Sequence, residues 1–116
     1  MSEDQYNGEN KREHYRIIYP LTCRPRLKII KKKYEVIDIS ESGIKFLYKK
    51  GADFTPSSKI NGEIIFNDGS SLEIEGEILR INDNILILKL YKSIPFWKIV
   101  EEQRYIKDNY PEYRLS

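Results

Sequence analysis

The sequence predicts a mainly β domain, a six-stranded antiparallel barrel followed by one C-terminal α-helix. Six short segments either alternate apolar and polar residues or are rich in β-branched residues, and polar turns separate them. After position 93 the apolar residues recur at helical spacing instead. Six short strands with polar turns favour a closed or nearly closed barrel. The 116 residues fit one domain, which is large enough to bury a core without a disulfide.

The chain opens with a polar stretch, residues 1–15, that has no sustained apolar period and is expected to form a flexible arm. Residues 16–116 are expected to form the barrel and its helix. The first strand is expected within residues 21–29, where mostly apolar residues take the odd positions and polar residues the even ones. Pro20 and Pro25 cannot donate to a β-ladder, so this strand is expected to start at a sheet edge or to contain a bulge.

Five further strands and one helix follow a charged lysine turn at residues 31–33. The residues Asn67-Asp68-Gly69-Ser70 are a strong hairpin signal between two of these strands. The helix is expected at about 93–110, with Ser93 as N-cap, Pro95 in the first turn and Pro111 ending it. The expected strands are 34–40, 43–48, 59–66, 71–81 and 85–91.

The formal net charge of +2 hides an uneven distribution. Residues 11–33 carry nine basic residues and one acid, Glu13, for a net charge of +8, while residues 1–10 and residues 34–116 each carry −3. A short cationic block in a mildly acidic chain predicts an anionic partner, which is a nucleic acid, a nucleotide, a phosphate or a membrane surface.

Several classes of protein are disfavoured by what the sequence contains. The single cysteine, Cys23, excludes an internal disulfide framework and a multi-cysteine zinc site, and its parity predicts a small core residue. No apolar run approaches the roughly 20 residues that span a bilayer, and no signal-peptide pattern opens the chain, so a cytoplasmic protein without membrane insertion is expected. Paired carboxylates, metal-ligand clusters and activated nucleophiles are not evident, so no enzyme activity and no metal are expected, and His14 is read as an exposed residue.

Two short motifs lie where predicted strands begin or end. Arg12 and Arg16 form an RxxxR element just before the first strand, and Asp38, Ser40 and Gly43 form a DxSxxG element at the end of the second. Each motif alone is weak, because short patterns of this kind occur by chance in many proteins. Their order, and their separation by one strand, make the joint signal specific.

This pair of motifs resembles the PilZ family, the bacterial cyclic di-GMP receptor domain. The resemblance covers most of the chain, including the helix with Ile94–Pro111, and it implies a PilZ-type barrel that binds cyclic di-GMP on its outer surface with the arm folded over the ligand. It also implies a ligand contact from an arginine on the fifth strand, here Arg80. The position before the first motif arginine varies in the family and is Lys11 here, which leaves the ligand stoichiometry and ligand-dependent dimerisation open. The candidate ligand-binding residues are Lys11, Arg12, Arg16, Asp38, Ser40, Gly43 and Arg80.

The chemistry of these residues suits cyclic di-GMP, which carries two phosphates and two guanines. A guanidinium fork matches a phosphate, or the O6/N7 edge of guanine, with two parallel hydrogen bonds. Asp38 can accept hydrogen bonds from the N1–H and N2–H₂ donors of guanine. In a regular strand Asp38 and Ser40 share one face, and Ile37 and Ile39 share the other. Gly43 is expected where the backbone needs a positive φ or where the ligand approaches the main chain.

The leading hypothesis is therefore a non-enzymatic receptor, without any cofactor, that binds cyclic di-GMP and passes the change in its arm to a protein partner. Machinery for motility, pili or exopolysaccharide is compatible with this, as is a monomer or a ligand-dependent dimer. One alternative is a PilZ-like module that binds proteins and not the nucleotide. Another is a small RNA-binding barrel, but the acidic strand face at Glu73, Glu75 and Glu77 would repel a nucleic acid polymer.

Overall fold

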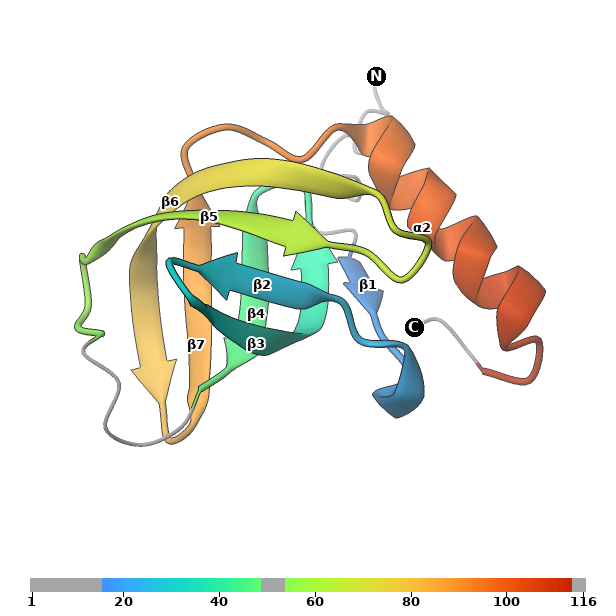
Figure 1. The fold of residues 1–116 in the computed structure, drawn as a ribbon, viewed down its shortest axis with the longest axis horizontal. Coiled ribbons are helices and arrows are strands. Elements are labelled where there is room, and N and C mark those ends of the chain that lie inside the picture. The colour runs from blue at the N-terminus through green and yellow to red at the C-terminus, as the bar shows by residue number, and fades with distance from the viewer. Residues whose placement is uncertain (1–15, 49–53, 114–116) are drawn as a thin grey trace, which may run out of the picture.

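A computed structural model describes residues 16–48 and 54–113 of the chain (Figure 1). The predicted arm, residues 1–15, lies outside the described residues, as do Lys11, Arg12 and His14 within it. The elements are β1 (Arg16–Ile18), a 3-10 helix η1 (Leu21–Cys23), β2 (Arg26–Ile29), β3 (Lys32–Ser40), β4 (Gly43–Leu47), β5 (Lys59–Ile65), β6 (Ser71–Asn82), β7 (Ile85–Leu90) and α2 (Phe96–Asn109).

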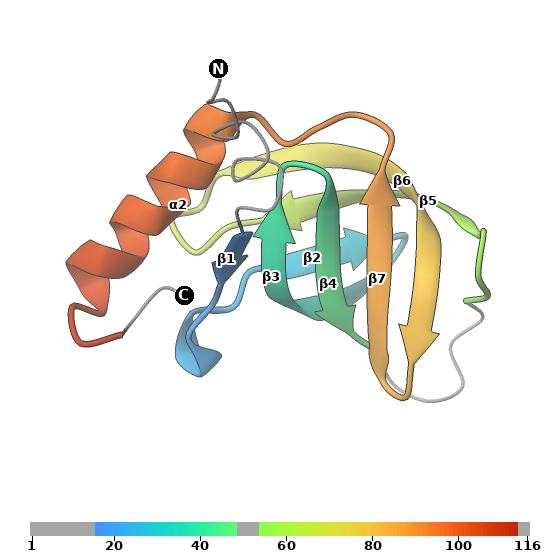
Figure 2. The same ribbon diagram turned by 180° about the vertical axis from the view of Figure 1, so that it is seen from behind.

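Six antiparallel strands close into a barrel, which confirms the predicted fold class. Neighbouring strands pair in the order β3, β2, β5, β6, β7 and β4, and the pairing of β4 with β3 completes the ring. The short strand β1 is an addition to this ring, because it pairs with the last residues of β3, where Arg16 lies opposite Ser40. The strands β1, β3, β4 and β7 lie side by side on one wall of the barrel (Figure 2).

The alternation of apolar and polar residues reflects the barrel wall, since every second side chain points into the core. Leu27, Phe46, Ile64, Leu86 and Leu88 come from four different strands and are all fully buried. The hairpin between β5 and β6 is also as predicted. Its Gly69 has a φ of +91°, a conformation that side-chain-bearing residues rarely adopt.

The first predicted strand is only partly correct. The strand begins at Arg26, and the preceding residues Leu21–Cys23 form the 3-10 helix η1, in which the Cys23 amide donates to the Pro20 carbonyl at 2.9 Å. Pro20 removes one donor and fixes a φ near −60°, which favours a turn over a β-ladder. Leu21 is therefore 74% exposed rather than in the core, whereas Cys23 is buried as predicted.

The helix α2 starts three residues later than predicted. Its N-cap is Pro95 rather than Ser93, and the Pro95 carbonyl accepts from the amide of Lys98 at 3.0 Å. The preceding residue, Ile94, is buried and donates its amide to the Glu41 carbonyl at 2.9 Å, which keeps that part of the chain extended along the barrel. The helix ends at Asn109, two residues before Pro111, as predicted. In the described part of the chain, no helix combines the length and the apolar character that a membrane crossing requires.

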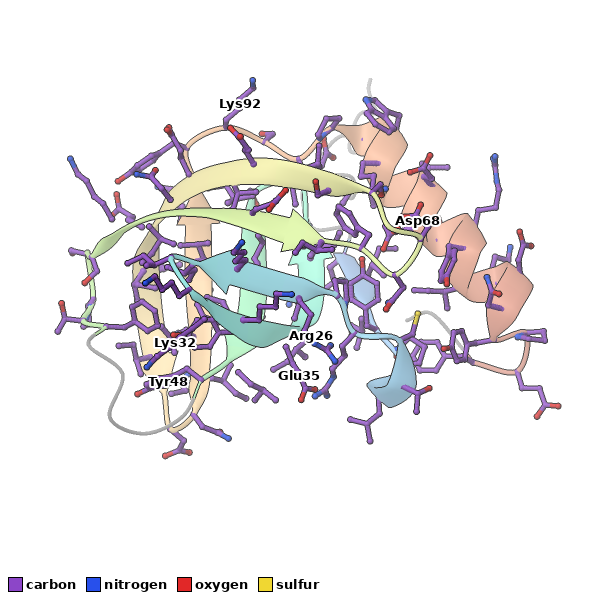
Figure 3. All side chains as sticks on the ribbon, in the orientation of Figure 1. Arg26, Lys32, Glu35, Tyr48, Asp68 and Lys92 are labelled. Atoms are coloured by element: carbon purple, nitrogen blue, oxygen red, sulfur yellow. The ribbon has the colours of Figure 1, made fainter. Side chains whose placement is uncertain are left out.

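A buried polar cluster joins α2 to the barrel, and the sequence pattern did not predict it. The Lys98 ammonium group is 2.7 Å from Ser70 Oγ and 2.6 Å from Glu101 Oε1, and it lies 4.2 Å from the centre of the Phe66 ring. Glu102 is 2% exposed and accepts a hydrogen bond from the Tyr19 hydroxyl at 2.6 Å. The hairpin that carries Ser70 also carries Asp68, which Figure 3 shows beside α2. The cluster ties the helix both to this hairpin and to the segment that follows β1.

Candidate ligand-binding groove

A groove of about 490 Å³ is lined by residues of β1, β3, β4, β6 and β7. Figure 2 shows the arrangement of these strands. Five of the seven candidate ligand-binding residues line it together, although they come from distant parts of the chain. The lining residues are Arg16, Asp38, Ser40, Ser42, Gly43, Ile44, Lys45, Leu79, Arg80, Ile87, Leu88 and Lys89. Of the other two candidates, Lys11 and Arg12, nothing can be placed, because both lie outside the described residues.

A β-bulge in β3 turns Asp38 toward this groove. Val36 pairs with Phe46 of β4, but the next pair is Asp38 with Lys45, so Ile37 is an extra residue without a partner in this ladder. Without the bulge Asp38 would follow the parity of Val36, which is fully buried in the core. A bulge re-aims the side chains that follow it, and here it directs Asp38 outward. The prediction that Ile37 and Ile39 share the face opposite Asp38 and Ser40 is therefore wrong, because the two residues that are buried in the core are Val36 and Ile39.

A second bulge, in β6, does the same for Arg80. Ile78 pairs with Leu88 of β7 and Arg80 pairs with Ile87, so Leu79 is the extra residue. Ile78 is buried, and a regular strand would send Arg80 into the core on the same side. The bulge instead leaves Arg80 exposed at the groove and leaves Leu79 57% exposed beside it.

Asp38 is the most deeply buried charged group of the groove. Its residue is 7% exposed, and its Oδ2 atom lies 3.6 Å from Lys45 Nζ and 4.0 Å from Arg16 Nη1. Burial raises the pKa of Asp38 above its ordinary value, although Lys45 and, to a smaller extent, Arg16 lower it. A carboxylate that the protein buries at an energetic cost, next to two cations in a groove, is a common feature of binding sites.

Ser40 and Gly43 shape the turn between β3 and β4. The Ser40 hydroxyl oxygen accepts hydrogen bonds from the amide of Gly43 at 3.1 Å and from that of Ser42 at 3.3 Å. Gly43 has no positive φ, so that part of the prediction is wrong. A Cβ atom on Gly43 would instead lie 2.9 Å from the carbonyl oxygen of Leu88, because β7 approaches closely at this point. Both residues therefore have a structural role at the rim of the groove.

The groove is strongly cationic. It is lined by four cationic side chains, Arg16, Lys45, Arg80 and Lys89, and by one carboxylate, that of Asp38. Lys45 and Lys89 were not predicted, because nothing in their sequence context separates them from ordinary outward-facing strand residues. Within the described ranges, no cluster of three or more His, Cys, Asp or Glu residues is arranged to hold a metal ion. The site is thus built to attract an anion with polar donor groups.

Comparison with known proteins agrees with this fold. The sequence model of the PilZ domain matches residues 10–104. Among solved structures, an uncharacterised protein from Legionella is similar, with a TM-score of 0.57 and 18% identity over 83% of this chain and 97% of that chain. At this identity the likeness concerns the fold alone. A search of curated proteins finds no match.

Proposed function

The chain belongs to the PilZ domain family, and we propose that it is a receptor that binds cyclic di-GMP in the groove beside Asp38. PilZ domains are generally non-catalytic binding modules, and members of the family commonly bind cyclic di-GMP. The observation that carries the proposal is the position of Asp38, which is almost buried yet lines an open cationic groove between Arg16 and Lys45.

Arg16 can supply hydrogen-bond donors to a guanine nucleotide, and Asp38 can supply acceptors. The guanidinium group of Arg16 can bind a phosphate, or the O6/N7 edge of guanine, with two parallel hydrogen bonds. The Asp38 carboxylate can accept from the N1–H and N2–H₂ groups on the other edge of guanine. Since the Arg16 side chain is 48% exposed, it has room to turn from Asp38 toward a ligand.

The remaining lining residues suit the same ligand. Arg80 and Lys89 come from the far strands of the groove and can balance a second phosphate. Leu79 and Ile87 offer apolar surface between these cations, against which a base or a ribose can pack. The groove volume of about 490 Å³ is within the range of roughly 300–1,000 Å³ that is usual for sites of small ligands.

Residues outside the described part of the chain also take part in the proposed binding. Binding orders residues 1–15 over the barrel, with Arg12 and Lys11 added to the ligand contacts, and the changed surface alters the interaction with a protein partner. The receptor acts in the cytoplasm as a monomer or a ligand-dependent dimer. Light scattering with and without cyclic di-GMP distinguishes the two states.

Isothermal titration calorimetry with cyclic di-GMP tests the proposal. We expect binding in the micromolar range or tighter, abolished in Arg12→Ala and Arg16→Ala and weakened in Asp38→Ala. Arg26→Ala is the matched control, because Arg26 is an exposed strand arginine on β2 that does not line the groove (Figure 3). It should bind as the wild type does.

Two results would contradict the receptor function. If the wild-type protein gives no heat with cyclic di-GMP but shifts single-stranded RNA in a gel, the RNA-binding alternative is correct. If it binds neither ligand, the chain is a PilZ module for protein contacts. An equal loss of affinity in Arg16→Ala and Arg26→Ala would move the binding site away from the groove.

A further inference from the structure

The deep position of Asp38 raises the question of what keeps its carboxylate available as a hydrogen-bond acceptor. Burial disfavours the charged form of a carboxyl group, and protonated Asp38 would lose one acceptor. Two cations contact the carboxylate, Arg16 from β1 and Lys45 from β4. The two contacts differ in distance and in the exposure of the cationic side chain, and Arg16 has a further role in the proposed function.

Lys45 has the closer and more sheltered contact. Its Nζ atom lies 3.6 Å from Asp38 Oδ2 and its side chain is 30% exposed, while Arg16 Nη1 lies 4.0 Å away on a side chain that is 48% exposed. The bulge at Ile37 produces this arrangement, because it makes Asp38 and Lys45 direct cross-strand partners. Opposite charges in such a position on antiparallel strands stabilise each other.

Arg16 also has a second task in the proposed function, since it contacts the ligand. When its guanidinium group turns toward a phosphate or a guanine, its attraction to Asp38 weakens. Lys45 is then the cation that remains beside the carboxylate. The other cations of the groove, Arg80 on β6 and Lys89 on β7, form no ion pair with Asp38 in the described part of the structure, where its cationic partners are Arg16 and Lys45.

We propose that Lys45 is a positioning residue, which holds the Asp38 carboxylate in place as the acceptor for guanine and so sets the lowest pH at which the groove binds cyclic di-GMP. This inference rests on the proposed function for its ligand. The contact between Lys45 and Asp38, however, exists in the free protein. It can therefore be tested separately from ligand binding.

The test compares Lys45→Met with Lys89→Met and with Lys45→Arg. Methionine keeps the length of the lysine stem and removes the charge, and Lys89 is an exposed lysine that lines the same groove. The first two variants thus remove the same charge from the same groove, but only Lys45→Met removes the cation that contacts Asp38. Lys45→Arg keeps a cation there and should behave as the wild type does.

The first measurement needs no ligand. The carboxyl carbon of Asp38 is followed by NMR as the pH is lowered, and we expect its pKa to be higher in Lys45→Met than in the wild type and unchanged in Lys89→Met. The reason is that Lys45 lowers the pKa of Asp38 against the effect of burial. An unchanged pKa of Asp38 in Lys45→Met, or an equal rise in Lys89→Met, would overturn the inference.

The second measurement is the affinity for cyclic di-GMP as a function of pH. Lys45→Met should bind about tenfold more weakly than the wild type at neutral pH, because the Asp38 carboxylate is then held less firmly as the charged acceptor for guanine. Its affinity should fall further in mild acid. Lys89→Met should weaken binding by the same factor at every pH, through the loss of positive field alone. Parallel pH profiles for the two variants would contradict a positioning role for Lys45. A wild type that binds no cyclic di-GMP would contradict the proposed function, while the NMR result would still decide the role of Lys45.

Discussion

The substitution Asp38→Asn distinguishes between two roles of the Asp38 carboxylate, which are ligand binding and a structural ion pair. If Asp38 serves mainly to hold β1 and β4 together, removal of its charge should cost about 3–5 kcal/mol of unfolding free energy, which is typical of breaking a buried ion pair. If the role of Asp38 is to bind the ligand, its buried charge destabilises the free protein. Its removal should then leave the unfolding free energy unchanged or increase it.

The structure favours the second outcome. Unit charges 4 Å apart attract by about 4 kcal/mol at an effective dielectric constant of about 20. Solvent screens the partly exposed Arg16 and Lys45, so their real contributions are smaller. Moving a carboxylate out of water costs several kcal/mol. Because the pKa of Asp38 is raised, burial outweighs the attraction of the two cations.

The sign of the pH dependence follows from this raised pKa. Between the ordinary pKa of an aspartate and the raised value, the folded state binds more protons than the unfolded state. The Asp38 contribution to stability therefore decreases as the pH rises through this window, and the full cost is present at neutral pH. Asp38→Asn removes that cost. Its advantage over the wild type should appear at neutral pH and shrink in acid.

Urea unfolding at several pH values and calorimetry with cyclic di-GMP measure the two effects. At neutral pH we expect Asp38→Asn to lose no more than about 0.5 kcal/mol of unfolding free energy. Its affinity should fall by about 100-fold or more, since each hydrogen bond to a charged acceptor is worth about 1.5–3 kcal/mol. Asp108→Asn, at an exposed position on α2, is the matched control and should change neither quantity. A destabilisation of 3 kcal/mol or more, on the order expected for a broken buried ion pair, with intact binding would refute the reasoning.

Three further substitutions, one in the buried cluster under α2 and two at the rim of the groove, are tested by chemical denaturation. Lys98→Met should lower the unfolding free energy by about 3 kcal/mol at neutral pH, because it leaves the buried Glu102 without its cation. The loss should diminish in acid, where Glu102, with its raised pKa, takes up a proton. A loss that does not depend on pH would point to packing instead. Gly43→Ala should cost about 1–3 kcal/mol, since its Cβ would press against the Leu88 carbonyl oxygen, and a neutral effect would mean that β7 can move away at this point. Ser40→Ala should lower the unfolding free energy by about 1 kcal/mol, because the two amide hydrogen bonds of the turn are lost. It should weaken cyclic di-GMP binding less than Asp38→Asn does. The reverse order would make Ser40 a ligand contact.

The barrel could be predicted from the sequence because its wall has a period of two residues and its turns contain distinctive residues. The departures occur where another force overrides that period. Pro20 favours a helical turn over a β-ladder, so Leu21 lies at the surface. Lys98 lies within the buried face of α2, where it pairs with Glu101 and Glu102 of the same helix and with Asp68 and Ser70 of the hairpin. The two hairpin partners are distant in the chain, and no local pattern indicates them.

The candidate site could be predicted in part, because the motifs named residues that line one groove. Asp38, Ser40 and Gly43 were identified by their spacing, and Arg16 by its order relative to them. The direction in which the Asp38 side chain points was correct, but the reason for it was not. The Asp38 side chain points outward both in a regular strand with Ile37 in the core and in a bulged strand with Val36 in the core. Only the pairing of β3 with β4 distinguishes the two.

The two bulges share a sequence pattern that supports a common purpose. Val36-Ile37-Asp38-Ile39 in β3 and Ile78-Leu79-Arg80-Ile81 in β6 both read apolar, apolar, charged, apolar. In each segment the first and fourth residues pack on the core, the second is the extra residue, and the charged third residue faces the groove.

A bulge interrupts the ladder and leaves one residue unpaired, and bulges occur often at the rims of barrels and next to active sites, where they re-aim a side chain. The same device occurs on two strands of one groove. On β3 it places an acid whose burial is unfavourable, and on β6 it places a cation. A carboxylate that is almost buried and lines a cationic groove suits the N–H donors of guanine, and a surface that only contacts proteins does not require it. The position of these two charges therefore favours a nucleotide ligand over a module that only binds proteins.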